Sequence, residues 1–436
     1  MDFKKNKEII AWSLYDFANQ PFTTLIVTFV FSKFFVEVLA KNEIVGTSLW
    51  SLGIAITAIF VSFLSPILGA LADAGGYRKL FLIISTYVCV LATVILFFFE
   101  PDQIYLIGGY QMHVSIIALC LFVIANIGFE FGTVFCNSYL TDLSNSQNIG
   151  KISGYAWGLG FVGGLLSLAM SLVLFDVSDN TNNVKYINLL VAVWLIVFSL
   201  PTFFYLKDQK PRKGFKRHVK SSIYSLITTF KNVSQHQSII KFLIARLFYN
   251  DALVTIFAFG GVYAGHIGFS FLEVLILGVV LNIAACIGSF LFGYLEDKIG
   301  VFRMLNITLW VLLASVLLAF FAPFFDCSKL ICLPKPLQNV INPKVLFWIA
   351  GFFIGLMQGP NQSGSRSLMA RLTPDDKKNE FFGFYAFSGK ATSFIGPLLF
   401  GILTAAFGTQ QAGLLIVVVF FILGIFFFRS LKLTVK

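Results

Sequence analysis

Runs of about 20 apolar residues recur along the whole 436-residue chain. An α-helix needs about this length to cross the ~30 Å hydrocarbon core of a bilayer. Charged residues make up only 12% of the sequence, roughly half the share found in soluble proteins, so most of the surface must face something other than water. The pattern predicts a helical membrane protein with many spans. The short alternating segments of a transmembrane barrel are absent from the sequence.

We expect twelve spans, at residues 9–37, 48–71, 80–99, 113–137, 151–175, 186–206, 241–265, 272–294, 304–325, 345–365, 381–406 and 411–428. The first apolar run is too long for the core of a signal peptide and is expected to be a true span. One long polar connection separates spans six and seven. The predicted domains are therefore an N-terminal six-helix bundle over 1–206, a basic linker over 207–240 and a C-terminal six-helix bundle over 241–436.

Lysine and arginine fix the expected orientation. With the N-terminus inside, the inside segments hold 24 of these residues and the outside loops hold five. By the positive-inside rule both termini are cytoplasmic, and we expect the protein in the cytoplasmic (inner) membrane of a bacterium. The net charge of +11 is then a topology signal, and it does not indicate binding to nucleic acid.

The stretch 207–241 holds nine basic residues and a single acid, Asp208. Within it Ile223, Leu226, Ile227 and Phe230 recur at helical spacing, which predicts a short amphipathic helix on the anionic cytoplasmic leaflet. The alternative is a simple tether between the two halves.

The two halves of the chain read as copies of one unit. "GALADAGGYRK" follows span two and "GYLEDKIGVFR" follows span eight, 224 residues later. "LYDFA" in span one has a counterpart, "FYNDA", in span seven. At a shift of 229, Ser138, Leu143 and Gly154 meet Ser367, Leu372 and Gly383. A duplicated six-span unit is the layout of alternating-access carriers, whose substrate site lies near the membrane midplane between the halves.

The two repeated loops, with the pattern G-x-L-x-D-x-x-G, resemble the signature loop of the major facilitator superfamily. Four stretches resemble one branch of it, the "unknown major facilitator" family, which includes the fungal autophagy-linked vacuolar amino-acid effluxers. They are "YDFANQPF", "ANIGFEFGTVFCN", "ARLFYNDALVTIFAFGGVYAG" and "GPNQSGSRSLMARLTPDDKKNEFFGFYAFSGKATSFIGPLLFG".

The resemblance implies an all-α major facilitator fold, with twelve transmembrane helices in two pseudo-symmetric bundles, and a proton-linked or facilitated carrier. It also implies that the signature loops gate transport, through Gly69, Asp73, Gly76, Arg78, Gly293, Asp297, Gly300 and Arg303. One departure concerns the first loop, where Ala74 follows Asp73 although the superfamily often has a basic residue there. The second loop keeps a base, Lys298, after Asp297.

Five charged residues lie deep inside the expected spans: Asp16, Glu130, Arg246, Asp251 and Lys390. A charge at the bilayer centre costs at least ~2.5 kcal/mol, so such residues usually face a cavity or a partner. Charged and other polar residues form stripes on spans one, four, seven and ten, the spans that border the central cavity in the major facilitator fold, and Lys390 lies on span eleven. Spans three, six, nine and twelve are nearly free of strong polarity. The candidate substrate-binding residues are Asp16, Asn19, Gln20, Asn126, Arg246, Tyr249, Asn250, Asp251, Gln358, Asn361 and Lys390.

Three carboxylates are candidates for proton coupling: Glu130, Asp16 and Asp251. Each has a structural alternative, because Asp16 and Asp251 could hold ion pairs or hydrogen bonds and Glu130 could serve the packing. We expect Arg246 to be the partner of an acid, since a buried guanidinium cannot release its proton. Lys390 is either a switchable cation or the partner of Glu130 or Asp16.

The sequence carries no Walker loop, nucleophile elbow, C-x-x-C motif or metal-ligand cluster, so we expect neither an enzyme nor a cofactor. The predicted function is secondary transport of a small polar or zwitterionic solute, such as an amino acid, with protons as the coupling ion. The alternatives are a drug or organic-anion exporter and a non-transporting receptor or scaffold. We expect a monomer in the lipid bilayer, and Cys327 and Cys332 could form a disulfide if their loop is exported.

Overall fold

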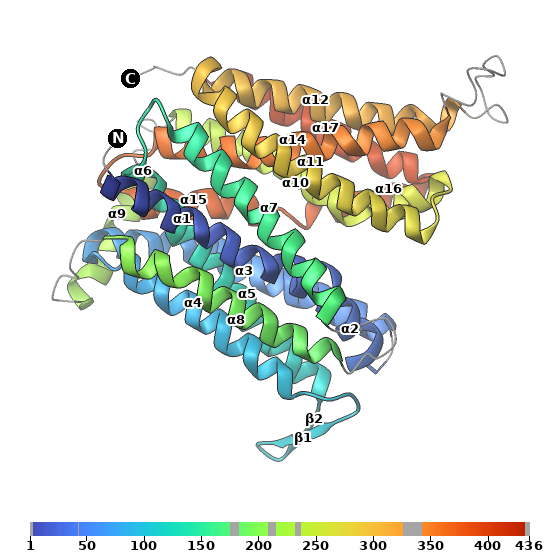
Figure 1. Ribbon diagram of the computed structural model, residues 1–436, viewed down its shortest axis with the longest axis horizontal. Coiled ribbons are helices and arrows are strands. Elements are labelled where there is room, and N and C mark those ends of the chain that lie inside the picture. The colour runs from blue at the N-terminus through green and yellow to red at the C-terminus, as the bar shows by residue number, and fades with distance from the viewer. Residues whose placement is uncertain are drawn as a thin grey trace. The chain divides into compact units, whose positions relative to one another are not determined.

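The structure is a computed structural model (Figure 1). It describes residues 3–41, 43–174, 183–207, 215–231, 237–325 and 342–431. Cys327 and Cys332 lie outside these ranges, so the possible disulfide remains a prediction.

Long helices dominate the described residues, as the apolar runs predict. Within these described ranges, eleven helical stretches are long and apolar enough to span a membrane. A further helix of 30 residues, α14, carries the polar stripe of the expected span ten. The helices are α1 (Phe3–Pro21), α2 (Phe31–Phe34), α3 (Glu43–Gly75), α4 (Arg78–Ile95), α5 (Val114–Ser138), α6 (Leu140–Leu143), α7 (Ile149–Leu174), α8 (Val184–Tyr205), α9 (Phe215–Lys231), α10 (Gln237–Ile267), α11 (Phe271–Ile299), α12 (Val301–Phe321), α14 (Pro343–Leu372), α15 (Lys378–Lys390), α16 (Ile395–Phe407) and α17 (Gln410–Arg429).

The chain divides into two compact units that exchange short segments of sequence. The first unit contains residues 1–143, 159–230 and 373–387, and the second contains residues 144–158, 231–372 and 388–436. The start of α7 therefore packs with the second half of the sequence, and the start of α15 packs with the first half. The expected boundaries at 206 and 241 do not include this exchange.

In the first unit α4 lies beside α5 and α8, and α1 packs on α8 (Figure 1). Pro21 has no backbone N–H, so the carbonyl of Phe17 one turn earlier has no helical donor. The indole Nε1 of Trp194 on α8 donates to that carbonyl at 3.1 Å. Beyond Pro21 the chain winds as a π-helix over Phe22–Phe29, a form often found at functional sites.

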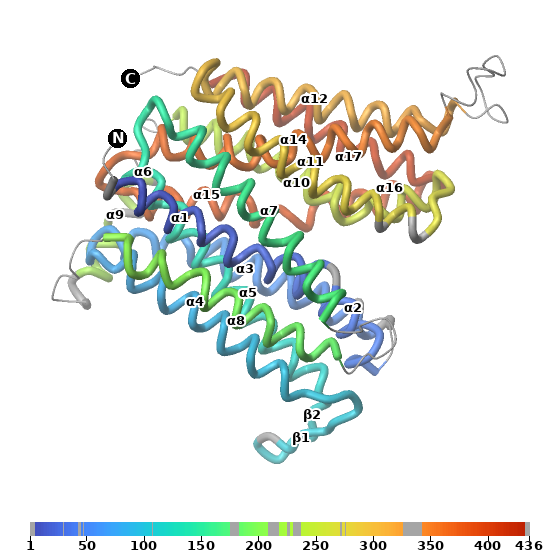
Figure 2. Tube along the Cα trace, viewed as in Figure 1, coloured from blue at the N-terminus to red at the C-terminus, as the bar shows by residue number. Residues whose placement is uncertain are grey.

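Two short strands form a hairpin that the sequence analysis does not predict. β1 (Ile104–Ile107) pairs antiparallel with β2 (Tyr110–His113), with Ile104 opposite His113 (Figure 2). Gly108 and Gly109 form the turn with positive φ, a geometry that glycine adopts without strain. Two adjacent glycines between two possible strands indicate a hairpin. A prediction based on the length of apolar runs does not detect this signal.

In the second unit α11 and α12 pack on α14, and α10 packs on α17 (Figure 1). The expected eleventh span, 381–406, is not one continuous helix. It breaks between Lys390, where α15 ends, and Ile395, where α16 begins. Pro397 lacks the N–H that would bond to residue 393, so a straight helix through this point would lose a hydrogen bond.

Candidate functional site

The aspartate of the first signature loop caps an exchanged helix inside the first unit. Asp73, near the end of α3, accepts hydrogen bonds from the backbone N–H groups of Asn379 (3.1 Å) and Glu380 (2.8 Å). These donors belong to the first turn of α15, whose N–H groups have no partner within the helix. The Asn379 side chain adds a third bond at 2.7 Å. A carboxylate at a helix N-terminus is also favoured by the helix dipole.

The second signature loop repeats this contact inside the second unit. Asp297, near the end of α11, accepts hydrogen bonds from the backbone N–H groups of Gly150 and Lys151, both at 2.9 Å. These residues open α7, the other exchanged helix. The sequence repeat is therefore also a repeat of structure. In each unit the loop aspartate caps the first turn of a helix whose start comes from the other half of the sequence.

Glycines let the backbones approach closely at both places. A Cβ on Gly154 of α7 would lie 2.6 Å from the Cα of Gly293 on α11. In the first unit, Gly69 of α3 packs against the backbone of Asn379 with no room for a side chain. Gly76 and Gly300, which follow the two aspartates, have φ of 67° and 87°, values that suit glycine in a tight turn.

The charged residues around the two loops differ. In the first unit Asp142 joins two bases, Arg78 Nη1 at 2.7 Å and Lys378 Nζ at 2.6 Å. In the second unit Arg303, which aligns with Lys79 at the shift of 224, is exposed. The base near the loop acids there is Arg371, whose Nη2 lies 3.6 Å from carboxylate oxygens of Glu296 and of Asp297. Glu296 is fully buried and also accepts a hydrogen bond from Ser367.

Arg366 is a functional candidate that the sequence analysis missed. Its Nη2 donates to the Ser153 carbonyl at 2.8 Å and its Nε donates to the Ser153 hydroxyl at 3.0 Å. The side chain is only 2% exposed. The expected span ten ended at residue 365, which placed this arginine in a loop; α14 continues to Leu372. Arg366 therefore belongs to a packed helix, which explains why its side chain is buried.

Four of the predicted site residues come together where α10 meets the break between α15 and α16. Arg246 Nη1 donates to Ser388 Oγ at 3.0 Å, and Asn250 Nδ2 donates to the Gly389 carbonyl at 3.0 Å. Asp251 follows on α10, and Lys390 ends α15. The discontinuous helix thus lies against the polar stripe of α10, as in carriers whose binding sites use broken helices.

Asp251 has an unusual environment. Its side chain is 1% exposed, and its Oδ1 has no hydrogen-bond partner among the described residues. Gly396, at the start of α16, packs against α10 beside the Asp251 carbonyl and Thr255. Burying a carboxylate oxygen without a partner is costly. Thr392, in the break between α15 and α16, lies close to this carboxyl group.

The other predicted residues of the second unit have other partners. Tyr249 shares a hydrogen bond with Ser365 of α14 at 2.7 Å. Asn361 Nδ2 contacts Thr308 Oγ1 of α12 at 3.4 Å. Gln358 is half-buried on α14. These contacts place Tyr249 and Asn361 within the helix packing of the second unit.

The candidates of the first unit lie on α1 and α5. Asn19 and Asn126 are buried, whereas Asp16, Gln20 and Glu130 are half-buried. A Cβ on Gly160 of α7 would lie 3.6 Å from the Asp16 Cβ, and one on Gly164 would lie 3.1 Å from the Gln20 Cγ. The glycines of α7 therefore let α1 approach closely on the face that carries Asp16 and Gln20.

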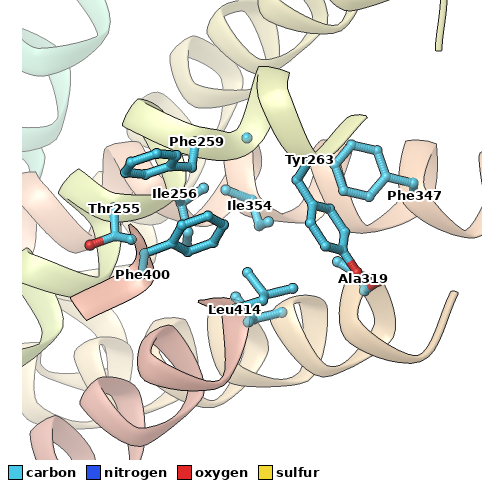
Figure 3. A pocket seen from close by; sticks show the side chains of 11 residues that line it. Thr255, Ile256, Phe259, Tyr263, Ala319, Phe347, Ile354, Phe400 and Leu414 are labelled. Carbon is cyan, nitrogen blue, oxygen red and sulfur yellow. Dashed lines mark hydrogen bonds between the residues drawn. The ribbon is translucent and has the colours of Figure 1, made fainter. Parts of the chain in front are cut away.

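A small apolar cavity lies near Thr255 in the second unit (Figure 3). Phe259, Tyr263 and Phe400 line it together with aliphatic side chains, and its volume is about 40 Å³. The Tyr263 hydroxyl at its edge donates to the Ala319 carbonyl at 3.1 Å. A cavity of this size holds one or a few waters, so it does not fit a metabolite. Among the described residues no group of His, Cys, Asp and Glu side chains fits a metal ion.

The cap at Asp297 gives a testable prediction. Asp297→Ala should lower the free energy of unfolding by about 1–2 kcal/mol, because two N–H groups of α7 lose their acceptor. The apparent melting temperature of the purified protein in detergent measures this loss. Asp375→Ala is the matched control, since that side chain is fully exposed and, within the described part of the chain, pairs with Lys378 one turn away, a surface contact of little energetic value. Equal melting temperatures for the two variants would contradict the prediction.

Comparisons with known proteins agree with this architecture. Residues 33–434 match the family described as vacuole effluxer Atg22 like. The chain is 25% identical over 429 residues to the uncharacterized MFS-type transporter YxiO of Bacillus subtilis (strain 168), covering 96% of this chain and 93% of that protein. It is 26% identical over 288 residues to autophagy-related protein 22 of Cryptococcus neoformans var. neoformans serotype D (strain JEC21), covering 64% of this chain and half of the fungal protein.

The fold also matches solved structures. The MFS proton:xylose symporter XylE, bound to 6-bromo-6-deoxy-D-glucose, superposes with a TM-score of 0.70 at 11% identity, over 98% of this chain and 95% of XylE. At this identity the likeness concerns the fold alone. The prediction of an all-α major facilitator fold is confirmed.

Proposed function

Because this chain belongs to the Atg22-like vacuole effluxer family of major facilitator transporters, which are not enzymes, we propose that it carries a small polar or zwitterionic solute, an amino acid or similar metabolite, with a proton as coupling ion. Transport by alternating access follows from the family. The solute and the proton are our proposals.

The observation that carries the proposal is the polar cluster on α10. Arg246 and Asp251 place a buried cation and a buried acid about 1.4 turns apart on α10, beside the broken span. A zwitterion needs such a pair: a guanidinium suits a carboxylate, and the Asp251 Oδ1 lacks a partner within the described residues, so it is available to an ammonium group. A purely apolar drug would gain nothing from either charge. Asn250 and Lys390 complete the proposed contacts.

The first unit offers its own proposed contacts. Asp16, Asn19 and Gln20 of α1 and Asn126 of α5 are polar positions on helices that are otherwise apolar. Tyr249, Gln358 and Asn361 remain in the proposed set, although Tyr249 and Asn361 have the structural partners described above.

For proton coupling we propose Asp251 first, with Glu130 and Asp16 as further candidates. Asp251 is the most deeply buried of the three. A carboxyl that is alternately protonated and paired with ligand links proton movement to the solute. The structural alternative, a carboxylate that only holds the packing, predicts no effect of a conservative amide replacement on coupling.

The proposed location is the cytoplasmic membrane of a bacterium, with both termini inside and the protein as a monomer. The lysine and arginine distribution supports this orientation, and a matching relative, YxiO, is bacterial. The signature-loop contacts of Asp73 and Asp297 would then lie at the cytoplasmic ends of their helices and serve gating.

Two rival functions remain open to test. An exporter of drugs or organic anions would use Arg246 and Lys390 but have no need of Asp251. A receptor or scaffold with a carrier fold would gain little from keeping charges in buried spans at a cost of at least ~2.5 kcal/mol each.

The experiment is a counterflow screen with purified protein in liposomes. Vesicles loaded with unlabelled amino acids, peptides, organic acids or nucleosides are assayed for exchange of the matching labelled solute. We expect exchange with at least one amino acid or related zwitterion. Exchange confined to organic anions would favour the rival carrier, and no flux of any solute, with or without a pH gradient, would refute transport. If Asp16→Asn, Glu130→Gln and Asp251→Asn all keep proton-driven accumulation, the coupling assignment is wrong.

A further inference from the structure

We propose that α9 is a two-faced latch that binds anionic lipid headgroups with one face while its other face holds the first turn of α15. The predicted amphipathic helix of the linker is present as α9, Phe215–Lys231. The structure adds what the sequence could not supply, namely which of its residues are already occupied by protein contacts and which are left open.

The inner face of α9 contacts the exchanged segment of the first unit. The hydroxyl of Thr229 donates to Glu380 Oε1 at 2.5 Å and accepts from Lys377 Nζ at 2.8 Å. Thr229 and Ser222, two turns apart, are both buried. Glu380 is the residue whose backbone N–H is bonded to Asp73. The linker helix therefore touches the same helical turn that the first signature loop holds.

A second contact fixes the depth of α9 along the spans. The ring of His218 lies 6.1 Å from the ring of Tyr77, in an edge-to-face arrangement. Tyr77 stands between α3 and α4, where two candidate spans end and begin. Lys377 directly precedes α15. Both anchor points are at span ends, so α9 lies at the membrane boundary of the first unit.

The outer face of α9 is apolar and exposed. Ile223, Tyr224 and Ile227 are 50%, 72% and 47% exposed, and they lie on one side of the helix at i, i+1 and i+4. Exposed Lys220 lies one turn before Tyr224. An apolar stripe with a basic edge at the level of the headgroups is the composition of helices that lie in the membrane interface.

The charge of the linker indicates what binds to the exposed apolar face of α9. Residues 207–241 contain nine basic residues and one acid, and each base near an anionic leaflet adds attraction. A surface of anionic lipid satisfies both the charge and the apolar stripe, and it is already next to the helix. The opposite face of α9 forms hydrogen bonds with residues at the start of α15. The charge of the lipid would therefore affect how strongly α9 binds the start of α15.

The test places a fluorescent amino acid at position 224 of the full-length protein by amber suppression. The protein is reconstituted in vesicles of phosphatidylcholine with increasing phosphatidylglycerol, and quenching by lipids with brominated chains is measured. We expect quenching that increases with the phosphatidylglycerol content. The same probe at exposed position 375 should stay unquenched. No quenching at 224 in any vesicle would show that this face does not bind lipid, and equal quenching in neutral vesicles would overturn the role of charge.

Two variants test the lipid contact of α9 and its contact with α15 separately. Lys220→Gln should weaken the lipid attraction of α9 about fivefold, the value of one base near an anionic surface, and so shift the quenching curve to higher phosphatidylglycerol. Thr229→Val should leave quenching intact, because its hydroxyl faces Glu380, but should remove the dependence of solute exchange on phosphatidylglycerol. If Thr229→Val keeps that dependence, α9 binds lipid without acting on α15. Because quenching requires no transport, failure of the proposed solute would leave the lipid-binding measurement unaffected, whereas the exchange measurement with Thr229→Val rests on the proposed function.

Discussion

Asp251→Asn is expected to abolish solute accumulation driven by a pH gradient while leaving counterflow exchange of the solute measurable. Asparagine keeps the size and one carbonyl oxygen of the side chain but cannot take up or release a proton. The native Oδ1 is buried without a hydrogen-bond partner among the described residues, so the replacement breaks no hydrogen bond to that oxygen within them. A carrier uncoupled in this way still exchanges solute and no longer concentrates it.

The measurement is labelled uptake into proteoliposomes with and without an imposed pH gradient. Asp375→Asn is the control, because it removes an acid whose side chain is fully exposed. We expect at least a tenfold loss of gradient-driven accumulation for Asp251→Asn, which corresponds to about 1.4 kcal/mol of coupling free energy. Unchanged accumulation with Asp251→Asn would assign Asp251 to packing, and loss of both activities would show that solute binding, as well as coupling, requires the carboxylate.

Gly293→Leu is expected to eliminate transport by forcing α7 away from α11. Even a methyl group on Gly293 would lie 2.8 Å from the Cα of Gly154 and 3.1 Å from the Gly150 carbonyl oxygen. Backbone atoms cannot move aside as a flexible side chain does, so the helices must separate and the two N–H bonds to Asp297 lengthen. Overpacking of this kind costs about 1–3 kcal/mol or more.

Gly278→Leu on the same helix is the matched control, because nothing lies within 4 Å of the Cβ position at Gly278. It should express and exchange solute as the native protein does, with a small gain from helix propensity. Gly293→Ala is the milder test should the leucine variant fail to fold: we expect a lower melting temperature and slower exchange. Native behaviour of Gly293→Ala would contradict the close contact between α7 and α11.

The fold could be predicted from the sequence because its main signals are local. Apolar runs of span length predict helices directly, and the repeated loops at a shift of 224 indicate the duplicated unit. The amphipathic linker helix was predicted from the spacing of Ile223, Ile227 and their neighbours, and it is present. Span length and amphipathic spacing depend only on residues close together in the chain, and the repeat is visible in the sequence without knowledge of any spatial contact.

The remaining features depend on contacts between distant residues or on helix ends. Arg366 was passed over because hydropathy ended span ten at 365, whereas the polar end of α14 is stabilised by its packing, including the bonds to Ser153. Glu296 was missed for the same reason on α11. The break after Lys390 has a local signal in Pro397, but a proline alone does not distinguish a bent helix from a broken one. The exchange of residues 144–158 and 373–387 has no signal within either segment.

That exchange bears on how the chain arose. Under the repeat shift of 229, the donors to Asp297, Gly150 and Lys151, correspond to Asn379 and Glu380, the donors to Asp73. Two identical six-span chains would have made this contact twice, each giving the start of its fifth helix to the other, as in a self-complementary homodimer. Gene fusion would then have joined an obligate pair. Neither half, expressed without the other, would retain the helix start that its own loop aspartate evolved to hold.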